Sequence, residues 1–233
     1  MMNATDARTL KQLLSSTTEP IAIHFCDQPP SGIGRVRTPG PAGCSYWKLA
    51  ADGDVFYTEV SDHLNCPIGA YTHGVELKSD GQAQLQGMIE KMVGIKYLKM
   101  EEVPKIPHRK EPLRFVVYAP LSRAEGTPDV VLFRGNARQI MLLTEAAQAS
   151  GIMSDSPIMG RPACAVIAET IGTGKVVSSL GCIGNRVYTN LGDDEFYVAV
   201  PGRSLAGLGE ALASIVEANS ELEKFHRDRC ACA

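Results

Sequence analysis

The sequence has no apolar run of the roughly 18–20 residues that a membrane-spanning helix needs. Its opening stretch, MMNATDARTLKQLLSS, also has no apolar core typical of a secretory signal. Charge of neither sign dominates, since the formal net charge of the 233-residue chain is −3. We therefore expect a cytoplasmic protein that binds neither nucleic acid nor a membrane.

The sequence also has no motif of several common enzyme classes. Its five histidines show no pairing at metal-ligand spacing, and neither a Ser/His/Asp set nor a pair of catalytic carboxylates can be assigned. GTGK, residues 172–175, resembles the end of a phosphate-binding loop. However, Glu169 and Val176 stand where that motif needs Gly and Ser or Thr. The sequence therefore does not decide whether the protein is an enzyme.

Cysteine is present, but not in the number or spacing of familiar scaffolds. Seven cysteines are too few for a disulfide framework in a chain of this length, and the Cys-x-x-Cys spacing of zinc ribbons is missing. Instead, one cysteine turn occurs twice, as HLNCPIGAYTHG at 63–74 and as SLGCIGNRVYTNLG at 179–192. In both stretches Ile-Gly lies within three residues of the Cys, and Tyr-Thr comes before a polar residue and a Gly.

Apolar periodicity predicts an α+β fold. Apolar or alternating runs indicate strands over 19–25, 54–60, 113–121, 129–135, 175–182 and 195–202. Helical spacing indicates a short N-terminal helix and further helices over 44–53, 81–98, 136–151, 164–174 and 204–226. The Pro/Gly-rich stretch 28–43 is long for a loop in a compact domain, so we expect it to cover another part of the molecule.

The order of these elements indicates an internal duplication. Cys44 begins a short predicted helix, a strand follows, and Cys66 lies in the first cysteine turn. Cys164 and Cys182 take the same places in the second half. The predicted strands EPIAIHF and EPLRFVV also begin alike.

The duplication predicts how the chain is organised. We expect a single domain over 1–233, in which two topologically similar halves pack around a pseudo-twofold axis. The halves span about 18–102 and 112–226, and residues 227–233 form a disordered tail.

A twofold arrangement would turn four cysteines toward a common centre, namely Cys44, Cys66, Cys164 and Cys182. Four thiolates are the usual ligands of an iron–sulfur cluster, and they also suffice for tetrahedral zinc. Cys44 and Cys164 stand at predicted helix N-termini, where free amides and the helix dipole stabilise a thiolate. We favour a [4Fe–4S] cluster over zinc, and the alternatives are four buried unreactive thiols or a set of redox thiols.

Polar and charged side chains near the cysteine turns are further candidates. His63 and His73 flank the first turn and could reach the site, although polar packing is the alternative for both. Arg161 and Arg186 lie close to the two cysteines of the second half. Either arginine could neutralise an anionic cluster or hold an anionic substrate, or could simply lie on the surface.

Tyr71 and Tyr188 are equivalent under the repeat and are predicted to pack over the site or within the core. Cys26 follows a predicted strand and has no counterpart in the other half, so core packing is its expected role. Cys230 and Cys232 lie beyond the last predicted helix, in the predicted disordered tail. The alternatives are that they capture a metal or act as a resolving thiol.

Several stretches resemble a known family. CSYWKLAADGD, APLSRAEGTPDVVLFRGNARQIMLL, and SLGCIGNR followed by DDEFYVAVPG are similar to the domain of unknown function 169 family, over most of the chain. The resemblance implies a soluble prokaryotic protein with cysteines at the four repeated positions, and it implies no substrate. Family members often carry a further Cys where this chain has Asn185, so the resemblance also implies that a cluster is bound differently here or is replaced by another cofactor.

The leading hypothesis is a soluble iron–sulfur protein that acts in electron transfer or redox chemistry with a redox partner protein or a small-molecule ligand. The first alternative is a non-catalytic carrier of a metal or small ligand, in which the loop at 28–43 is a lid. The second is a metal-free thiol enzyme that uses Cys44 or Cys164 as a nucleophile of low pKa.

Overall fold

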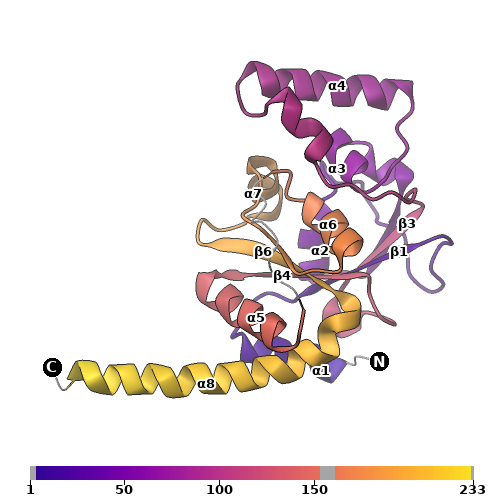
Figure 1. Ribbon diagram of the computed structural model, residues 1–233. Helices are drawn as coiled ribbons and strands as arrows, with labels where there is room; N and C mark the ends of the chain where they lie inside the picture. The colour runs from indigo at the N-terminus through magenta and orange to yellow at the C-terminus, as the bar shows by residue number, and fades with distance from the viewer. Residues whose placement is uncertain (1–3, 153–160, 232–233) are drawn as a thin grey trace.

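The computed structural model describes residues 4–152 and 161–231 as one α+β domain built on a six-stranded antiparallel sheet (Figure 1). The strand order is β2-β3-β1-β4-β6-β5, so β1 and β4 lie at the centre and β2 and β5 at the edges. The strands are β1 (Ile21–Cys26), β2 (Phe56–Glu59), β3 (Phe115–Pro120), β4 (Val130–Asn136), β5 (Val177–Ser179) and β6 (Glu195–Pro201).

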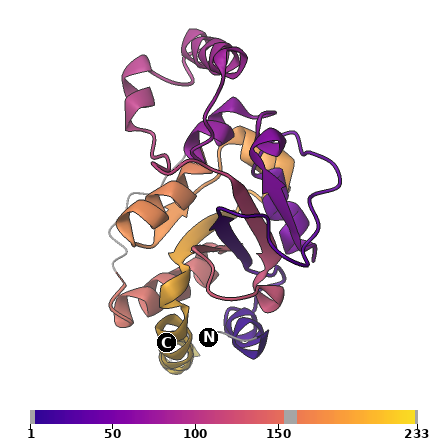
Figure 2. The ribbon, with the colours of Figure 1, turned by 90° about the vertical axis from the view of Figure 1, so that its right-hand side faces the viewer.

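Helices cover both faces of the sheet, because successive strand residues point to opposite sides and both sides are apolar. On one face Ala22, Val131 and Val198 pack against α1 (Ala4–Leu13), α5 (Ala137–Ala149) and α8 (Leu205–Ala231). On the other face Ile23 and Leu132 pack against α2 (Ser45–Ala51) and α6 (Ala165–Thr173). Figure 2 shows the two helical layers on either side of the sheet.

The remaining helices lie above the α2 and α6 layer. They are α3 (Pro67–Thr72), α4 (Ser79–Gly94) and α7 (Ile183–Thr189), together with the 3₁₀ segments Val60–His63 and Met100–Lys105. Two further 3₁₀ segments contact helices of the other face, Leu121–Arg123 against α1 and Gly202–Ser204 against α8. α4 stands farthest from the sheet (Figure 1). None of the described helices is long and apolar enough to span a membrane.

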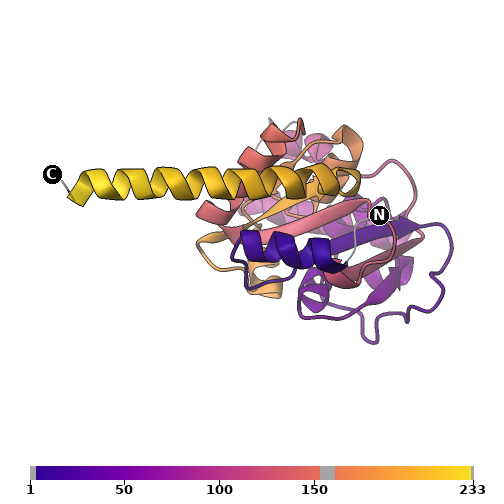
Figure 3. The same cartoon turned by 90° about the horizontal axis from the view of Figure 1, so that it is seen from below.

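The predicted strands and longer helices are confirmed, with two differences. Both cysteine turns contain a short helix, α3 and α7, that the sequence analysis did not predict. α8 continues to Ala231, so the predicted disordered tail is wrong for residues 227–231. Figure 3 shows the C-terminal end of this helix extending beyond the rest of the domain. Cys232 lies outside the described residues.

The stretch 28–43 covers the edge strand β2, as expected for a long loop. Val36 donates its amide to Tyr57, and Tyr57 donates its amide to Gly34, which shields part of the open edge. Arg35 donates two hydrogen bonds, at 3.0 and 2.8 Å, to the buried carboxylate of Asp62. This bidentate pair fixes the segment that leads into the first cysteine turn.

Three residues of the stretch FRGNARQ, residues 133–139, make structural hydrogen bonds. Arg134 donates to Glu195 at 3.0 Å and to the carbonyls of Thr189 and Asn190 at 3.1 and 2.6 Å, so it ties β4 to the C-terminal end of α7. Asn136 caps α5, and Gln139 returns a hydrogen bond to the Asn136 amide.

Replacing Arg134 by Ala is expected to lower the free energy of unfolding by about 2–4 kcal/mol, because Glu195 and two helix carbonyls lose a charged donor in a partly buried place. Arg138→Ala is the matched control, since Arg138 is 62% exposed and pairs with Glu223 on the surface. We expect that control to cost about 0.5 kcal/mol or less. Urea denaturation measures both, and equal losses would contradict the role assigned to Arg134.

Candidate metal centre

Each of the four repeated cysteines stands directly before a short helix. Cys44 caps α2, Cys66 caps α3, Cys164 caps α6 and Cys182 caps α7. The prediction that Cys44 and Cys164 begin helices is confirmed. Cys66 and Cys182 also begin helices, which the sequence did not predict. Four helix N-termini therefore each present one thiol.

The cysteines fall into two conformational pairs. Cys44 and Cys164 share helical backbone angles, with φ −71° and ψ −16° for the first and φ −65° and ψ −17° for the second. Cys66 and Cys182 instead have extended ψ angles of 91° and 165°. Cys44 and Cys164 thus share one backbone conformation, whereas Cys66 and Cys182 both have a positive ψ.

The four thiols lie near one another. Every one of the six pairs among Cys44, Cys66, Cys164 and Cys182 interacts electrostatically. No disulfide joins any of them, since all four are free thiols. Among residues 4–152 and 161–231, however, no three His, Cys, Asp or Glu side chains form a ready site for a single metal ion.

Two of the thiols are contacted by polar side chains that lie far away in the sequence. Thr72, on α3, donates its hydroxyl to the Cys164 sulfur at 3.1 Å. Asn185, on α7, approaches Cys44 closely enough to lower the pKa of that thiol, against the larger effect of burial. Cys66 is held locally, because the Gly69 amide donates to its sulfur at 3.4 Å. Side chains on the two cysteine turns therefore reach across the site.

Burial makes the thiols weak acids. It raises the pKa of Cys44 to about 12, raises that of Cys164 well above its ordinary value, and raises that of Cys66. A nucleophile of low pKa at Cys44 or Cys164 needs the opposite shift. These thiols are thus protonated at neutral pH unless a ligand displaces their protons.

Several buried polar atoms around the thiols have no hydrogen-bond partner of ordinary geometry. They include the Tyr118 hydroxyl and both amide atoms of Asn185. Tyr118 interacts electrostatically with Cys44 and Cys164, which places it beside the site. An unpaired buried polar group is costly, so these atoms would gain from contact with a polar or charged ligand.

His63 and His73 are fully buried next to the first cysteine turn, with ring centroids 5.4 Å apart. His63 Nε2 lies 2.9 Å from the Thr58 hydroxyl, and His73 Nδ1 lies 2.9 Å from the Gly69 carbonyl oxygen. His63 Nδ1 and His73 Nε2 have no partner. Burial lowers the pKa of His63 well below its ordinary value and that of His73 to about 4, so both rings are neutral at pH 7.

The other candidates make contacts away from the thiols. Arg161 pairs with Glu102 and lies over the Tyr97 ring. Arg186 donates to the Leu180 and Gly192 carbonyls, which closes the loop around α7.

The contacts described for Tyr71 and Tyr188 do not involve the four thiols. Tyr71 packs on His108, with ring centroids 4.6 Å apart, and Tyr188 is 40% exposed. Cys26 is partly exposed at the end of β1, and Cys230 is exposed on α8.

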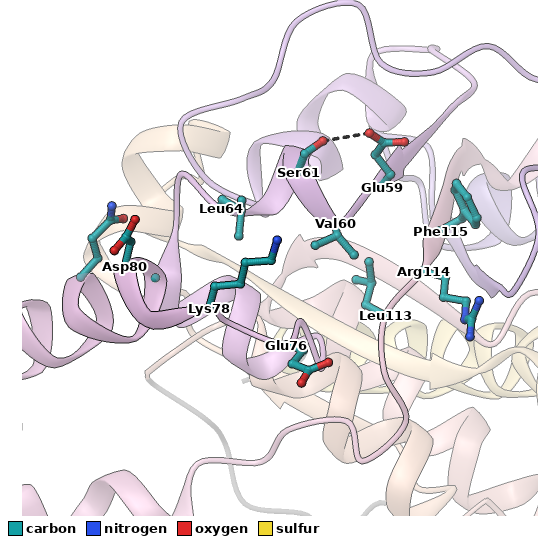
Figure 4. A pocket seen from close by; sticks show the side chains of 12 residues that line it. Glu59, Val60, Ser61, Leu64, Glu76, Lys78, Asp80, Leu113, Arg114 and Phe115 are labelled. Carbon is teal, nitrogen blue, oxygen red and sulfur yellow. Dashed lines mark hydrogen bonds between the residues drawn. The ribbon is translucent and has the colours of Figure 1, made fainter.

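A groove of about 690 Å³ lies away from the thiols, between the start of α4 and the β2–β3 edge of the sheet (Figure 4). Apolar side chains of Val60, Leu64, Leu113 and Phe115 and charged side chains of Glu59, Lys78, Asp80 and Arg114 line it. A second cavity, about 310 Å³, lies beside Trp47 and Arg134. None of the four repeated cysteines lines either cavity.

The chain was compared with family models, curated proteins and solved structures. The model of the DUF169 family, described as uncharacterised ArCR, matches residues 9–211. The chain belongs to the DUF169 family. It is 30% identical over 172 residues to the uncharacterized protein MJ0308 of Methanocaldococcus jannaschii. The matched region covers 67% of this chain and 69% of the relative. No solved structure matches the chain.

The buried histidines predict a loss of stability in mild acid. Because the pKa of His73 falls from 6.5 to about 4 on folding, the neutral ring is favoured in the folded state, and its stabilising effect is lost as pH falls from 6.5 toward 4. His73→Gln should flatten the pH dependence of unfolding in that window by up to about 1.4 kcal/mol per pH unit. Urea midpoints from pH 7 to 4 measure this, with the partly exposed His108→Gln as control. A slope that stays the same in His73→Gln would contradict a buried neutral imidazole.

Proposed function

We propose that this DUF169 protein binds an iron–sulfur cluster, of the [4Fe–4S] type, and acts in electron transfer. The observation that carries the proposal is the meeting of four helix-capping cysteines, Cys44, Cys66, Cys164 and Cys182, whose six pairs all interact. Four thiolates are the ligand set of such clusters. When bound, the cluster supplies one-electron redox chemistry.

An iron–sulfur cluster and a zinc ion place different demands on four thiols. Four sulfurs that share one zinc ion each lie about 2.3 Å from it, which demands a tight tetrahedron. In a cubane cluster each cysteine binds a different iron atom, so its four sulfurs stand farther apart. The four thiols interact with one another, but no three of the described His, Cys, Asp and Glu side chains form a ready single-ion site, and for this reason we propose a cluster rather than zinc.

The surroundings of the thiols support an anionic occupant. The Gly69 amide and the Thr72 hydroxyl donate toward Cys66 and Cys164, and such donors stabilise bound thiolates. Asn185 and the Tyr118 hydroxyl are buried without partners beside Cys44, so they offer further polar contacts.

Full ligation by four cysteines favours electron transfer over substrate chemistry, because no coordination position is left open. The raised pKa values of Cys44 and Cys164 count against the metal-free thiol enzyme. They also mean that cluster binding must release the thiol protons of Cys44 and Cys164, so that affinity rises with pH.

The pairing of strands supports an internal duplication with its axis between β1 and β4. Ile21 of β1 lies opposite Pro120, the last residue of β3, and Val130 of β4 lies opposite Pro201, the last residue of β6. After each proline the next amide donates to the residue that precedes the central strand, Leu121 to Pro20 and Gly202 to Asp129.

This register favours a different boundary between the halves. The units β2-β3-β1 and β5-β6-β4 are equivalent in order, and α2 packs on β1 and β3 as α6 packs on β4 and β6. The second half then begins at β4, and β3 completes the first half. The boundary predicted at about residue 112 depends on the likeness of EPIAIHF and EPLRFVV. The strands formed by these two stretches, β1 and β3, pair with each other in the sheet, so in the proposed duplication they are neighbours within one half.

Cys182→Ser should remove most of the bound iron and sulfide from protein purified without oxygen, because one ligand of the cluster is lost. Cys26→Ser and Cys230→Ser are matched controls, since both replace free thiols outside the site, and they should keep the iron and sulfide of the unmodified chain. Chemical analysis of both elements, with the visible absorption spectrum, measures the outcome. Equal metal content in all three variants would refute the ligand assignment.

A further inference from the structure

α7 buries a polar face and exposes an apolar face, which is the reverse of an ordinary surface helix. Asn185 and Thr189 are buried on its inner face, while Ile183 and Val187 on its outer face are 66% and 65% exposed. Globular proteins normally turn the apolar stripe of a helix toward the core. The polar inner face serves the thiol site, so the apolar outer face needs a separate explanation.

Four exposed apolar residues lie on or next to α7, namely Leu180, Ile183, Val187 and Tyr188, and we call them the α7 patch. It holds four of the ten large hydrophobic side chains that are exposed in the described part of the chain. The patch flanks Cys182, which is itself partly exposed. Clustered exposed apolar groups mark interaction sites more often than scattered ones do.

The equivalent helix of the first half is covered. The chain between α4 and β3 crosses α3, where the Arg109 amide donates to Thr72 at 3.0 Å and His108 packs on Tyr71. The connection from α7 to β6 is only the short segment 190–194. Tyr188, the counterpart of Tyr71, therefore has no such cover within the described residues.

The rim of the α7 patch is acidic. Asp193 and Asp194 are exposed on the segment that follows α7. Asp193 Oδ1 lies 3.7 Å from Arg186 Nη1 of α7, which places this loop beside the patch. An apolar centre with an acidic rim is complementary to a basic partner with an apolar face.

We propose that the α7 patch is the docking surface for a basic redox partner protein, which exchanges electrons with the proposed cluster through the Cys182 side. This inference rests on the proposed function. In the exchange one electron passes from the reduced cluster to the oxidised partner, or in the reverse direction, and no covalent bond forms or breaks. The acidic rim speeds encounter, and the apolar centre fixes the complex.

The test uses ferricytochrome c, a basic haem protein, as the partner probe and ferricyanide as a small oxidant. Stopped-flow oxidation of the anaerobically reduced protein is compared for the unmodified chain, Ile183→Ser/Val187→Ser, and the control Leu222→Ser/Phe225→Ser. The control pair lies on α8 and is 57% and 53% exposed, so it removes similar apolar surface away from the site. Iron and sulfide are assayed in every sample.

We expect the α7 variant to keep its iron, sulfide and rate with ferricyanide, and to lose at least about tenfold in its rate with ferricytochrome c. The α8 control should react like the unmodified chain. Asp193→Asn/Asp194→Asn should weaken the salt dependence of the ferricytochrome c rate.

Equal ferricytochrome c rates in the unmodified chain and the α7 variant would overturn the docking surface, and so would an equal loss in the α8 control. An unmodified chain without iron and sulfide would instead overturn the proposed function, and this inference with it. Loss of iron in the α7 variant alone would assign these residues to holding the site rather than to docking, which also overturns the proposal.

Discussion

The antiparallel pairing of β1 with β4 is the contact on which the rest of the structure depends. It joins two three-stranded units edge to edge and lays α2 and α6 on the same face of the sheet. Because Cys44 and Cys164 cap these helices, the pairing also determines where the two halves present their thiols. Cys66 and Cys182 arrive from α3 and α7, which follow the edge strands.

Burial then decides what the thiols can do. A thiol whose pKa lies near 12, as that of Cys44 does, is a poor nucleophile at neutral pH. The same burial suits a bound cluster, since it excludes water and strengthens the contacts of Gly69 and Thr72 with sulfur. The neutral histidines His63 and His73 add no charge to the site at pH 7.

The sequence predicted the parts of the site better than their assembly. The repeated order of elements singled out four cysteines, and the structure places each of them at a helix N-terminus. The contacts of Thr72 and Asn185 were missed, because each side chain reaches a cysteine far away in the sequence. α3 and α7 were read as turns, since helices of six and seven residues show too little periodicity to be recognised.

The strand order could not be predicted for a related reason. The likeness of EPIAIHF and EPLRFVV suggested that β1 and β3 are equivalent, whereas the two strands pair with each other. Alternating apolar residues record which face of a strand is buried, and they do not record which strand lies beside it. The proposed equivalence of β1 with β4 rests on the register around Pro120 and Pro201, which no sequence pattern records.

Native mass spectrometry of the anaerobically purified chain tests the central claim most directly. The account predicts a mass increase equal to one iron–sulfur cluster per chain, with the loss of four thiol protons. A chain that carries a single zinc ion, or that has the mass of the bare polypeptide, would contradict the account.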